Sequence, residues 1–332
     1  MNNYLKGYVA VIIPCYNGAP FLESCLKSIL IQTYSMIEVI IVNDGSTDES
    51  ESIILSYKKE IEEKGYFFTY IKQKNEGAAG AVNKALKQVK SEFIMLYDVD
   101  DFLMKDAIKI KAEFLLKNKE YGMVRSNGYY VSPDDLQNKS KLFTISENEM
   151  KNEHIFDDIL FERTYNWPST FMVRTECLFK HLKNKSIYVS KYGQNMQIML
   201  PVAYHYRSSF INIPLTRYLI RNGSVSHSSS IERNLELQNG FYKNRIEIIK
   251  QLDIPDKIKK EYIEKVDIYY LKRKIAFGCE YKQKDLLKTE YKKLKKINSA
   301  SKKDTVYYLL GVVPGLHVFY GVAKWIYHKK QN

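Results

Sequence analysis

The chain of 332 residues lacks several features that mark common protein classes. Its four cysteines lie far apart without a C-x-x-C pair, which favours neither a disulfide framework nor a zinc site and predicts a reducing compartment. No G-x-G-x-x-G turn follows the first predicted strand, so a dinucleotide-binding fold loses its main support. No charged segment followed by a long apolar one opens the chain, so we expect no secretory signal and a cytosolic catalytic part.

Positive charge is concentrated at the end of the chain. The formal net charge is +13, and residues 243–303 hold 19 Lys and Arg against 9 Asp and Glu. Residues 304–332 add three lysines and one aspartate, which leaves the first 242 residues nearly neutral. This asymmetry favours a basic surface facing an anionic partner, such as a membrane, a nucleic acid or a polyanionic chain.

The first 130 residues alternate β-rich apolar runs with helical patterns. Strands are predicted at 9–13, 39–42, 67–71, 93–97 and 123–131, and helices at 21–31, 48–62, 78–89 and 105–118. This alternation predicts an α/β fold with a mostly parallel mixed sheet and helices on both faces. Less regular helices (153–161, 194–206) and strands (169–173, 210–213) follow. We expect a domain at 1–228, a basic helical extension at 229–303 and a tail at 304–332.

Polar residues follow three of the predicted strands, where ligands bind in open α/β sheets. In IIPCYNGAPFL, Tyr16 offers a flat ring for a base and Asn17 a paired donor and acceptor. The alternative is an ordinary turn into a helix, with Pro14 and Asn17 as turn residues. In IIVNDGSTDES, Asp44 either accepts the imino N–H of a uracil or caps the next helix.

The third strand end, FIMLYDVDDFL, carries three crowded carboxylates: Asp98, Asp100 and Asp101. Their mutual repulsion would be relieved by a bound cation. Magnesium-type sites use one or two carboxylates with substrate phosphates and water, so the D-x-D pair indicates a clamp for a metal and a diphosphate. The alternative is a solvated acidic turn, with Asp101 near a helix N-terminus.

These motifs resemble the family 2 glycosyltransferases with the GT-A fold, of the kind that build bacterial cell-surface polysaccharides. The likeness runs through VAVIIPCYNGAPFLESCLKSILIQTYSMIEVIIVNDGSTDES, KNEGAAGAVNKAL and FIMLYDVDDFL, in order and at ordinary spacing. It covers about residues 8–120 tightly and extends loosely to about 228.

The resemblance implies roles for particular residues. Tyr16 would stack on the nucleobase that Asp44 contacts, Asp98 would lie near the ribose or sugar, and Asp100 would bind Mn²⁺ or Mg²⁺ on the diphosphate. The implied donor-binding residues are Pro14, Tyr16, Asn17, Asp44, Asn75, Gly77, Asn83, Asp98 and Arg221, and the implied metal ligands are Asp98, Asp100 and His227. Val82 departs from the family, which commonly has an arginine at that position.

A second departure concerns the catalytic base. The family usually supplies a Glu-Asp pair where this chain has Gln194 and Asn195, and amides cannot act as bases at neutral pH. Another carboxylate could serve, the acceptor could be a phosphate that needs no base, or the amides position the acceptor while the metal assists leaving-group departure. The carboxylates considered are Asp157, Asp158 and Glu176, and the implied catalytic residues are Asp100, Gln194 and Asn195.

The tail contains an uncharged run, TVYYLLGVVPGLHVFYGVA, which Pro314 and neighbouring glycines interrupt. We expect an in-plane anchor on the anionic inner face of the cell membrane. The alternatives are a spanning helix, or a helix packed on the catalytic domain or in a homo-oligomer.

The sequence therefore predicts a metal-dependent hexosyl- or N-acetylhexosaminyltransferase. It would move a sugar from a nucleotide-diphosphate sugar, with a UDP-sugar favoured, to a saccharide or lipid-linked acceptor, and inversion is the family's expectation. No nucleic-acid partner is expected. Two alternatives remain: a nucleotidyltransferase, which usually shows a glycine-rich loop with a basic residue after the first strand, and a non-catalytic module that binds sugar or nucleotide.

Overall fold

The computed structural model describes residues 4–132, 141–165, 167–220 and 230–329. The chain divides into two compact units. The first comprises Met1–His227 with Gln251–Asp253, and the second comprises Ser228–Lys250 with Ile254–Asn332.

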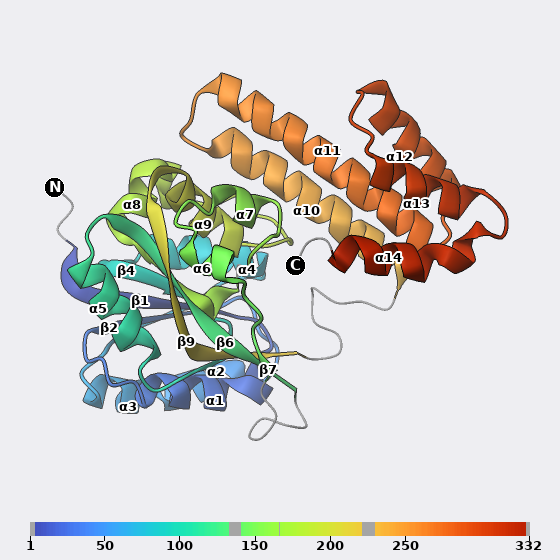
Figure 1. Cartoon of the computed structure of the whole chain (residues 1–332). Coiled ribbons are helices and arrows are strands. Elements are labelled where there is room, and N and C mark those ends of the chain that lie inside the picture. The colour runs from blue at the N-terminus through green and yellow to red at the C-terminus, as the bar shows by residue number, and fades with distance from the viewer. Residues whose placement is uncertain (1–3, 133–140, 166, 221–229, 330–332) are drawn as a thin grey trace. The chain divides into compact units, whose positions relative to one another are not determined.

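The first unit is built on a mixed sheet, which has nine strands among the described residues (Figure 1). The strands are β1 (Leu5–Cys15), β2 (Ile37–Asn43), β3 (Phe67–Lys72), β4 (Ser91–Leu96), β5 (Phe102–Leu103), β6 (Tyr121–Val131), β7 (Lys141–Leu142), β8 (Phe171–Arg174) and β9 (Arg207–Leu219). Their order is β3-β2-β1-β4-β8-β6-β9-β5, with β7 beside β6. Strands β3, β2, β1 and β4 are parallel, and β8 runs antiparallel to both β4 and β6. The predicted α/β class with a mixed sheet is confirmed.

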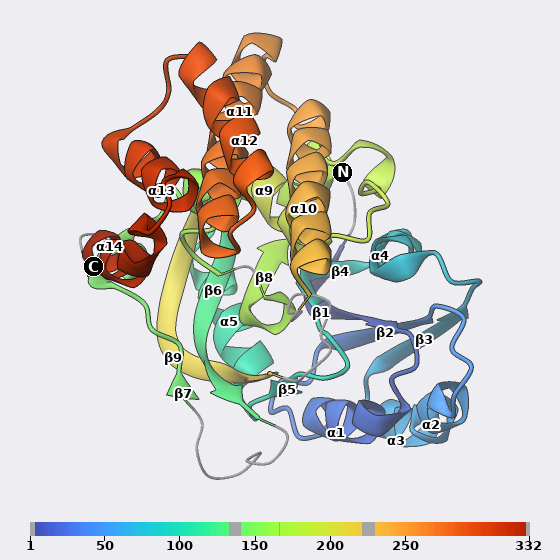
Figure 2. The ribbon, with the colours of Figure 1, turned by 90° about the vertical axis from the view of Figure 1, so that its right-hand side faces the viewer.

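Helices cover both faces of the parallel strands, as the wholly buried sequence IEVIIVN of β2 requires. Helices α1 (Ala19–Leu30), α2 (Ser50–Ser56) and α3 (Lys58–Glu63) lie on one side and α4 (Gly77–Leu86) on the other (Figures 1 and 2). The unit's remaining described helices are α5 (Ala107–Lys117), α6 (Glu147–Lys151), α7 (Phe156–Leu160), α8 (Thr175–His181) and α9 (Asn195–His205), with 3₁₀ turns η2 (Pro168–Thr170) and η3 (Lys183–Lys185).

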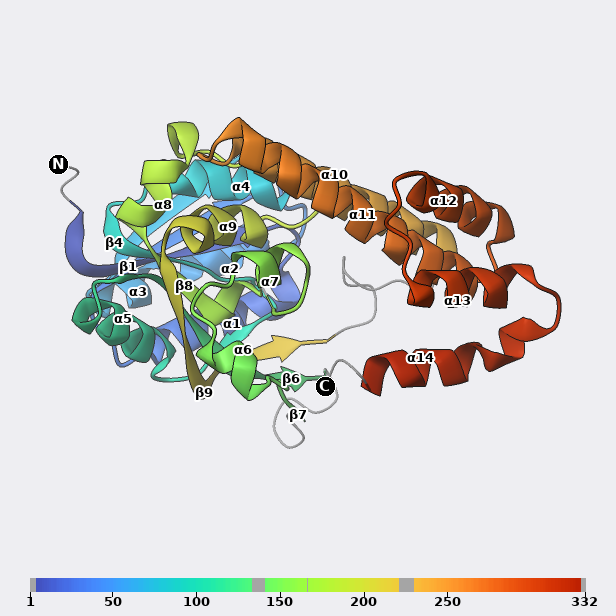
Figure 3. The ribbon, with the colours of Figure 1, turned by 45° about the horizontal axis from the view of Figure 1, so that its top comes forward.

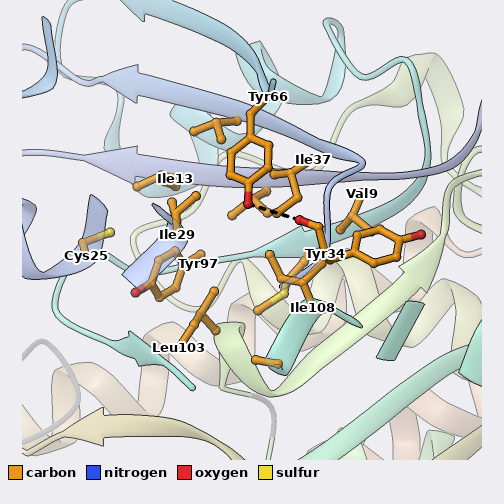
Figure 4. Packing of buried hydrophobic residues seen from close by; sticks show 14 of the residues in the cluster. Val9, Ile13, Cys25, Ile29, Tyr34, Ile37, Tyr66, Tyr97, Leu103 and Ile108 are labelled. Carbon is orange, nitrogen blue, oxygen red and sulfur yellow. Dashed lines mark hydrogen bonds between the residues drawn. The ribbon is translucent and has the colours of Figure 1, made fainter. Parts of the chain in front are cut away.

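Tyrosines close the core between the sheet and α1 (Figure 4). The hydroxyl of Tyr66 donates to the backbone oxygen of Tyr34 at 3.1 Å. The fully buried Tyr97 donates to the backbone oxygen of Asp101 at 3.0 Å and shares a hydrogen bond with Ser28 of α1. The chain segment just after β4 is therefore anchored to the core.

The structure departs from the predicted elements in several places, and the short elements β5, β7 and α6 were not predicted. The predicted helix 48–62 is two helices, which meet at Tyr57. The predicted strand 210–213 is the middle of β9, which is 13 residues long because it pairs with β6 on one edge and β5 on the other. Helix α8 was not predicted. Pairing between distant segments lengthens a strand in a way that local sequence does not reveal.

The second unit is helical (Figure 3). Its described helices are α10 (Ile231–Gln251), α11 (Asp256–Glu280), α12 (Lys284–Lys296), α13 (Lys302–Val312) and α14 (Tyr320–Lys329), with the 3₁₀ turn η4 (Leu316–Phe319) before α14. Ser301 and Asp304 form a capping box that begins α13. A side chain at Gly311 would come within 2.3 Å of Leu287, so glycine lets α13 pack closely on its neighbours.

The predicted tail at 304–332 shares a core with the helices that precede it, since Tyr307 and Leu310 of α13 pack with Ile275 of α11 and Leu294 of α12. The three-part domain division stays a prediction. Among the described residues, no helix combines the length and the apolar character needed to cross a bilayer.

Candidate functional site

The carboxyl ends of parallel strands bring most of the predicted site residues to one edge of the sheet. At that edge the backbone N–H of Asp44 donates to the carbonyl of Cys15 at 2.8 Å, and that of Tyr97 donates to the carbonyl of Ile12 at 2.9 Å. Pro14, Tyr16 and Asn17 at the end of β1, Asp44 after β2, and Asp98 and Asp100 after β4 therefore follow neighbouring strands.

Asp44 is buried, with 2% of its surface exposed, and it holds the loop that follows β3. Its Oδ1 accepts hydrogen bonds from Gln73 Nε2 at 2.6 Å and from the backbone N–H of Glu76 at 2.8 Å. Gly45 has φ +76°, and a Cβ there would lie 2.9 Å from the backbone nitrogen of Asn75. The loops after β2 and β3 are therefore in close contact, and Asp44 is a hydrogen-bond acceptor within the protein rather than a helix cap.

The turn after β1 presents an aromatic ring. Tyr16 is 53% exposed, while the next residue, Asn17, has φ +48°. Asn17 Oδ1 accepts the backbone N–H of Thr47 at 2.8 Å, and its own N–H donates to Ser46 Oγ at 3.0 Å. Asn17 thus ties the turns after β1 and β2 together, and the ring of Tyr16 stays accessible beside them.

The three residues of the predicted N-x-G…N segment are placed differently. Asn75 is exposed, and its Oδ1 accepts the N–H of Gly77 at 3.2 Å where α4 begins. Asn83 points elsewhere: its amide pairs with both backbone groups of Ile187, at 2.9 Å and 2.7 Å. Gln197 of α9 holds the backbone of Tyr188 in the same way. Asn83 therefore anchors the segment that leads to α9.

The three carboxylates after β4 have different surroundings. Asp98 and Asp100 are partly exposed, whereas Asp101 is only 3% exposed and accepts a hydrogen bond from Ser169 Oγ. Burial raises the pKa of Asp101 well above its usual value, and the charges of Asp98 and Asp100 raise it further. The buried Lys111 of α5 donates to the carbonyl of Ser169 at 2.8 Å. Asp101 is therefore part of the interior, and the sequence signalled neither Ser169 nor Lys111.

The carboxylates after β4 suit a divalent cation only if a bound molecule supplies further oxygen atoms to it. No three His, Cys, Asp or Glu side chains in the described ranges gather closely enough to hold a metal by themselves. Asp98 and Asp100 offer carboxylate oxygens close together, and their negative charges are strong enough at this point to raise the pKa of the neighbouring buried Asp101. Mg²⁺ and Mn²⁺ are hard cations that accept one or two carboxylates plus phosphate oxygens and water, so these residues fit such an ion.

The residues at the usual base position introduce α9. Gln194 precedes the helix in helical conformation and Asn195 begins it, with an Oδ1 that is buried and has no hydrogen-bond partner. Glu176 is the second residue of α8, and Thr175, the first, donates to the carbonyl of Ser91 at the amino end of β4, the opposite edge from Asp98. Asp158 bonds Asn152 at 2.7 Å, and Asp157 also lies in α7. Arg221 and His227 lie outside the described residues.

Solved structures share this fold. S. aureus TarS 1–349 in complex with UDP-GlcNAc superposes with a TM-score of 0.58 and 19% identity, covering 96% of this chain and 87% of that one. The mannosyltransferase PcManGT from Pyrobaculum calidifontis, in complex with GDP-Man and Mn²⁺, gives a TM-score of 0.55 and 16% identity over 95% and 86% of the two chains. The architecture is thus the GT-A fold.

The model of glycosyl transferase family 2 matches residues 10–181, and the chain belongs to this family. An uncharacterized glycosyltransferase of Rickettsia typhi is 35% identical over 151 residues, 42% of this chain and 45% of that protein. Glycosyltransferase GlyA of Streptococcus pneumoniae is 28% identical over 66% of this chain and 31% of that protein. The poly-beta-1,6-N-acetyl-D-glucosamine synthase of Staphylococcus epidermidis is 32% identical over 36% and 28%. The chain spans less than half the length of these relatives.

Proposed function

We propose that this chain transfers a sugar from a nucleotide-diphosphate sugar, most favourably a UDP-sugar, in a reaction that depends on Mn²⁺ or Mg²⁺. The observation that carries the proposal is the convergence of Asp44, Tyr16 and the pair Asp98–Asp100 at one sheet edge. A nucleotidyltransferase would need a basic glycine-rich loop after β1, and the turn there is CYNGAP.

Each residue has a defined task in the proposed site. The exposed ring of Tyr16 stacks on the base, and the Asp44 carboxylate, already held by Gln73, accepts a hydrogen bond from the imino N–H of the base. Asp98 contacts the ribose or sugar, and Asp100 and Asp98 hold the cation. A divalent ion supplies charge neutralisation for the departing diphosphate. Arg221 and His227 are further candidates for the diphosphate and the metal.

The acceptor is proposed to be a saccharide or lipid-linked saccharide used in cell-surface polysaccharide synthesis at the inner face of the membrane. Gln194 and Asn195 would position its hydroxyl group, since amides donate and accept hydrogen bonds but do not take up protons at neutral pH. Asp157 and Asp158 of α7 remain the candidate bases, with inversion at the anomeric carbon. Glu176 is set aside because it lies at the opposite edge of the sheet.

Thermal stabilisation by nucleoside diphosphates tests the donor site. UDP, GDP, CDP, dTDP and ADP are each added with and without Mn²⁺ to the full chain and to Asp100→Ala. A ligand at ~100 times its dissociation constant adds about 2.7 kcal/mol to the free energy of unfolding. We expect a Mn²⁺-dependent rise in Tm with UDP that Asp100→Ala abolishes and that Asp285→Ala, an exposed carboxylate of α12, retains.

No shift with any nucleotide would refute the proposed donor site. Stabilisation without turnover of the matching nucleotide sugar, hydrolysis included, would favour the non-catalytic module instead.

A further inference from the structure

Within the second unit, one side of the segment formed by η4 and α14 packs against the helices that precede it. His317 Nε2 lies 2.9 Å from the carbonyl oxygen of Cys279, and Lys324 pairs with Glu280 at 2.7 Å. Leu316, Tyr320 and Ala323 pack against the core that α11, α12 and α13 share. One side of the segment is therefore fixed to the unit by polar and apolar contacts.

The other side of the same segment is apolar and exposed. Its residues have exposed fractions between 41% and 77%: Val318, Phe319, Val322, Trp325 and Ile326. Positions 318, 322, 325 and 326 follow the spacing of one helix face, so the side chains form a continuous stripe. On an ordinary protein surface, exposed apolar residues are scattered singly. Five large apolar side chains gathered on one side of a segment therefore indicate an interaction site.

The charge of the surrounding unit selects the kind of partner. α12 carries six lysines against two acidic residues, and α13 begins with Lys302 and Lys303. Two copies of a strongly basic unit repel each other. An anionic bilayer attracts the lysines by charge, and its interfacial region removes the apolar stripe from water. The stripe also contains Trp325, and tryptophan is enriched at membrane–water interfaces.

We propose that the stripe of Val318, Phe319, Val322, Trp325 and Ile326 enters the interfacial region of an anionic lipid bilayer, with α14 in the membrane plane. This inference deepens the proposed location at the membrane and is independent of the proposed sugar transfer. It assigns the anchoring to the outer side of η4 and α14, and to lysines that supply long-range attraction. An in-plane helix needs no spanning length, in agreement with the described helices.

Vesicle cosedimentation of the full chain tests the proposal. Vesicles contain phosphatidylcholine with 30 mol% phosphatidylglycerol, or phosphatidylcholine alone. We expect the wild type to bind the anionic vesicles. The partition coefficient of the double variant Phe319→Ser/Trp325→Ser should be lower by about tenfold or more, because the variant lacks two apolar side chains that the bilayer would remove from water. Phe67→Ser, which removes a phenylalanine of similar exposure from β3, should bind like the wild type.

Two results of the vesicle experiment would overturn the proposal. The first is that the wild type does not bind, and the second is that the double variant binds as well as the wild type, which would mean that charge alone causes the binding. A third is a wild-type dimer, seen by light scattering, that the double variant converts to a monomer without any change in vesicle binding, since the stripe would then bind a second copy. The nucleotide-dependent Tm of the double variant is measured in parallel, so a failed donor site is distinguished from a failed anchor.

Discussion

Asp98, Asp100 and Asp101 follow the same strand, but only Asp101 faces the interior. Its carboxylate accepts from Ser169, and Ser169 in turn accepts from Lys111. The inward carboxylate fixes the position of the loop, and Asp98 and Asp100 stay at the surface of the strand end. The buried Asp101 thus fixes the positions of Asp98 and Asp100, the two acids that we propose bind the cation.

Lys111 makes the stability of the fold depend on pH. Burial lowers its pKa to about 7, from a usual value of 10.5. Between these values the unfolded chain holds a proton that the folded chain lacks, so the free energy of unfolding rises with pH, by at most about 1.4 kcal/mol per unit. This contribution is fully present above about 10.5 and is lost as the pH falls through 7. Lys111→Met should lack it.

Urea unfolding at pH 7, 8 and 9 checks this expectation. The free energy of unfolding of the wild type should rise relative to that of Lys111→Met with each pH step. Lys109→Met, which removes an exposed lysine from the same helix, gives the baseline. Equal pH slopes for the wild type and Lys111→Met would mean that the buried amine stays charged in the folded protein.

Single residues of the site were predicted only where a local motif carries them. Asp44, Asp98 and Asp100 follow apolar runs whose length marks a strand, and the ends of parallel strands necessarily meet. The partner of Asp101 lies 68 positions away, and that of Asn83 lies 104 positions away. No local pattern contains these partners, so the inward turn of Asp101 and the anchoring role of Asn83 required the structure.

At the scale of elements, the loops after β2 and β3 are held together by glycine and a buried acid. Gly45 approaches the backbone of Asn75, and Asp44 binds the same loop through Gln73 and Glu76. The strands were predicted well because each is a nearly continuous apolar run. Strands β8 and β9 were predicted poorly because β8 is short and β9 depends on pairing with β6 and β5.

Gly45→Ala should damage both stability and nucleotide binding. A methyl group there meets strain at φ +76° and a backbone nitrogen at 2.9 Å, so the loop carrying Asn75 must move. Gly65→Ala is a matched control, with φ +83° and nothing within 4 Å of the new atom. Both variants should lose about 1–3 kcal/mol in urea unfolding, with the larger loss at Gly45.

Nucleotide affinity separates the two glycine variants. Only Gly45→Ala should weaken UDP–Mn²⁺ binding, measured by calorimetry, because only its clash displaces a loop that Asp44 holds. Equal affinities would show that this loop does not contribute to the donor site.

At the scale of the whole molecule, the proposed donor site and most of the net positive charge belong to two different units that have separate cores. The sequence already contains this asymmetry of charge, since nearly all of the excess of Lys and Arg over Asp and Glu lies in the last ninety residues. The predicted division at residue 304 stays a prediction, and the structure adds that α13 packs with α11 and α12 through contacts that Gly311 permits. A glycine within a predicted helix does not reveal which other helix packs against it.

Separate cores predict that a donor ligand stabilises one unit and not the other. With UDP and Mn²⁺ at ~100 times the dissociation constant, amides of β1, β2 and β4 that exchange through unfolding should exchange about 100-fold more slowly. Amides of α11, α12 and α13 should keep their rates, because their protection depends on the core around Leu287 and Leu294. Hydrogen exchange read by mass spectrometry measures both sets in one sample, and Asp100→Ala with the same ligands supplies the baseline. Equal slowing in both sets would mean that the two units unfold together as one cooperative structure, and the basic helices would then sense the occupancy of the donor site.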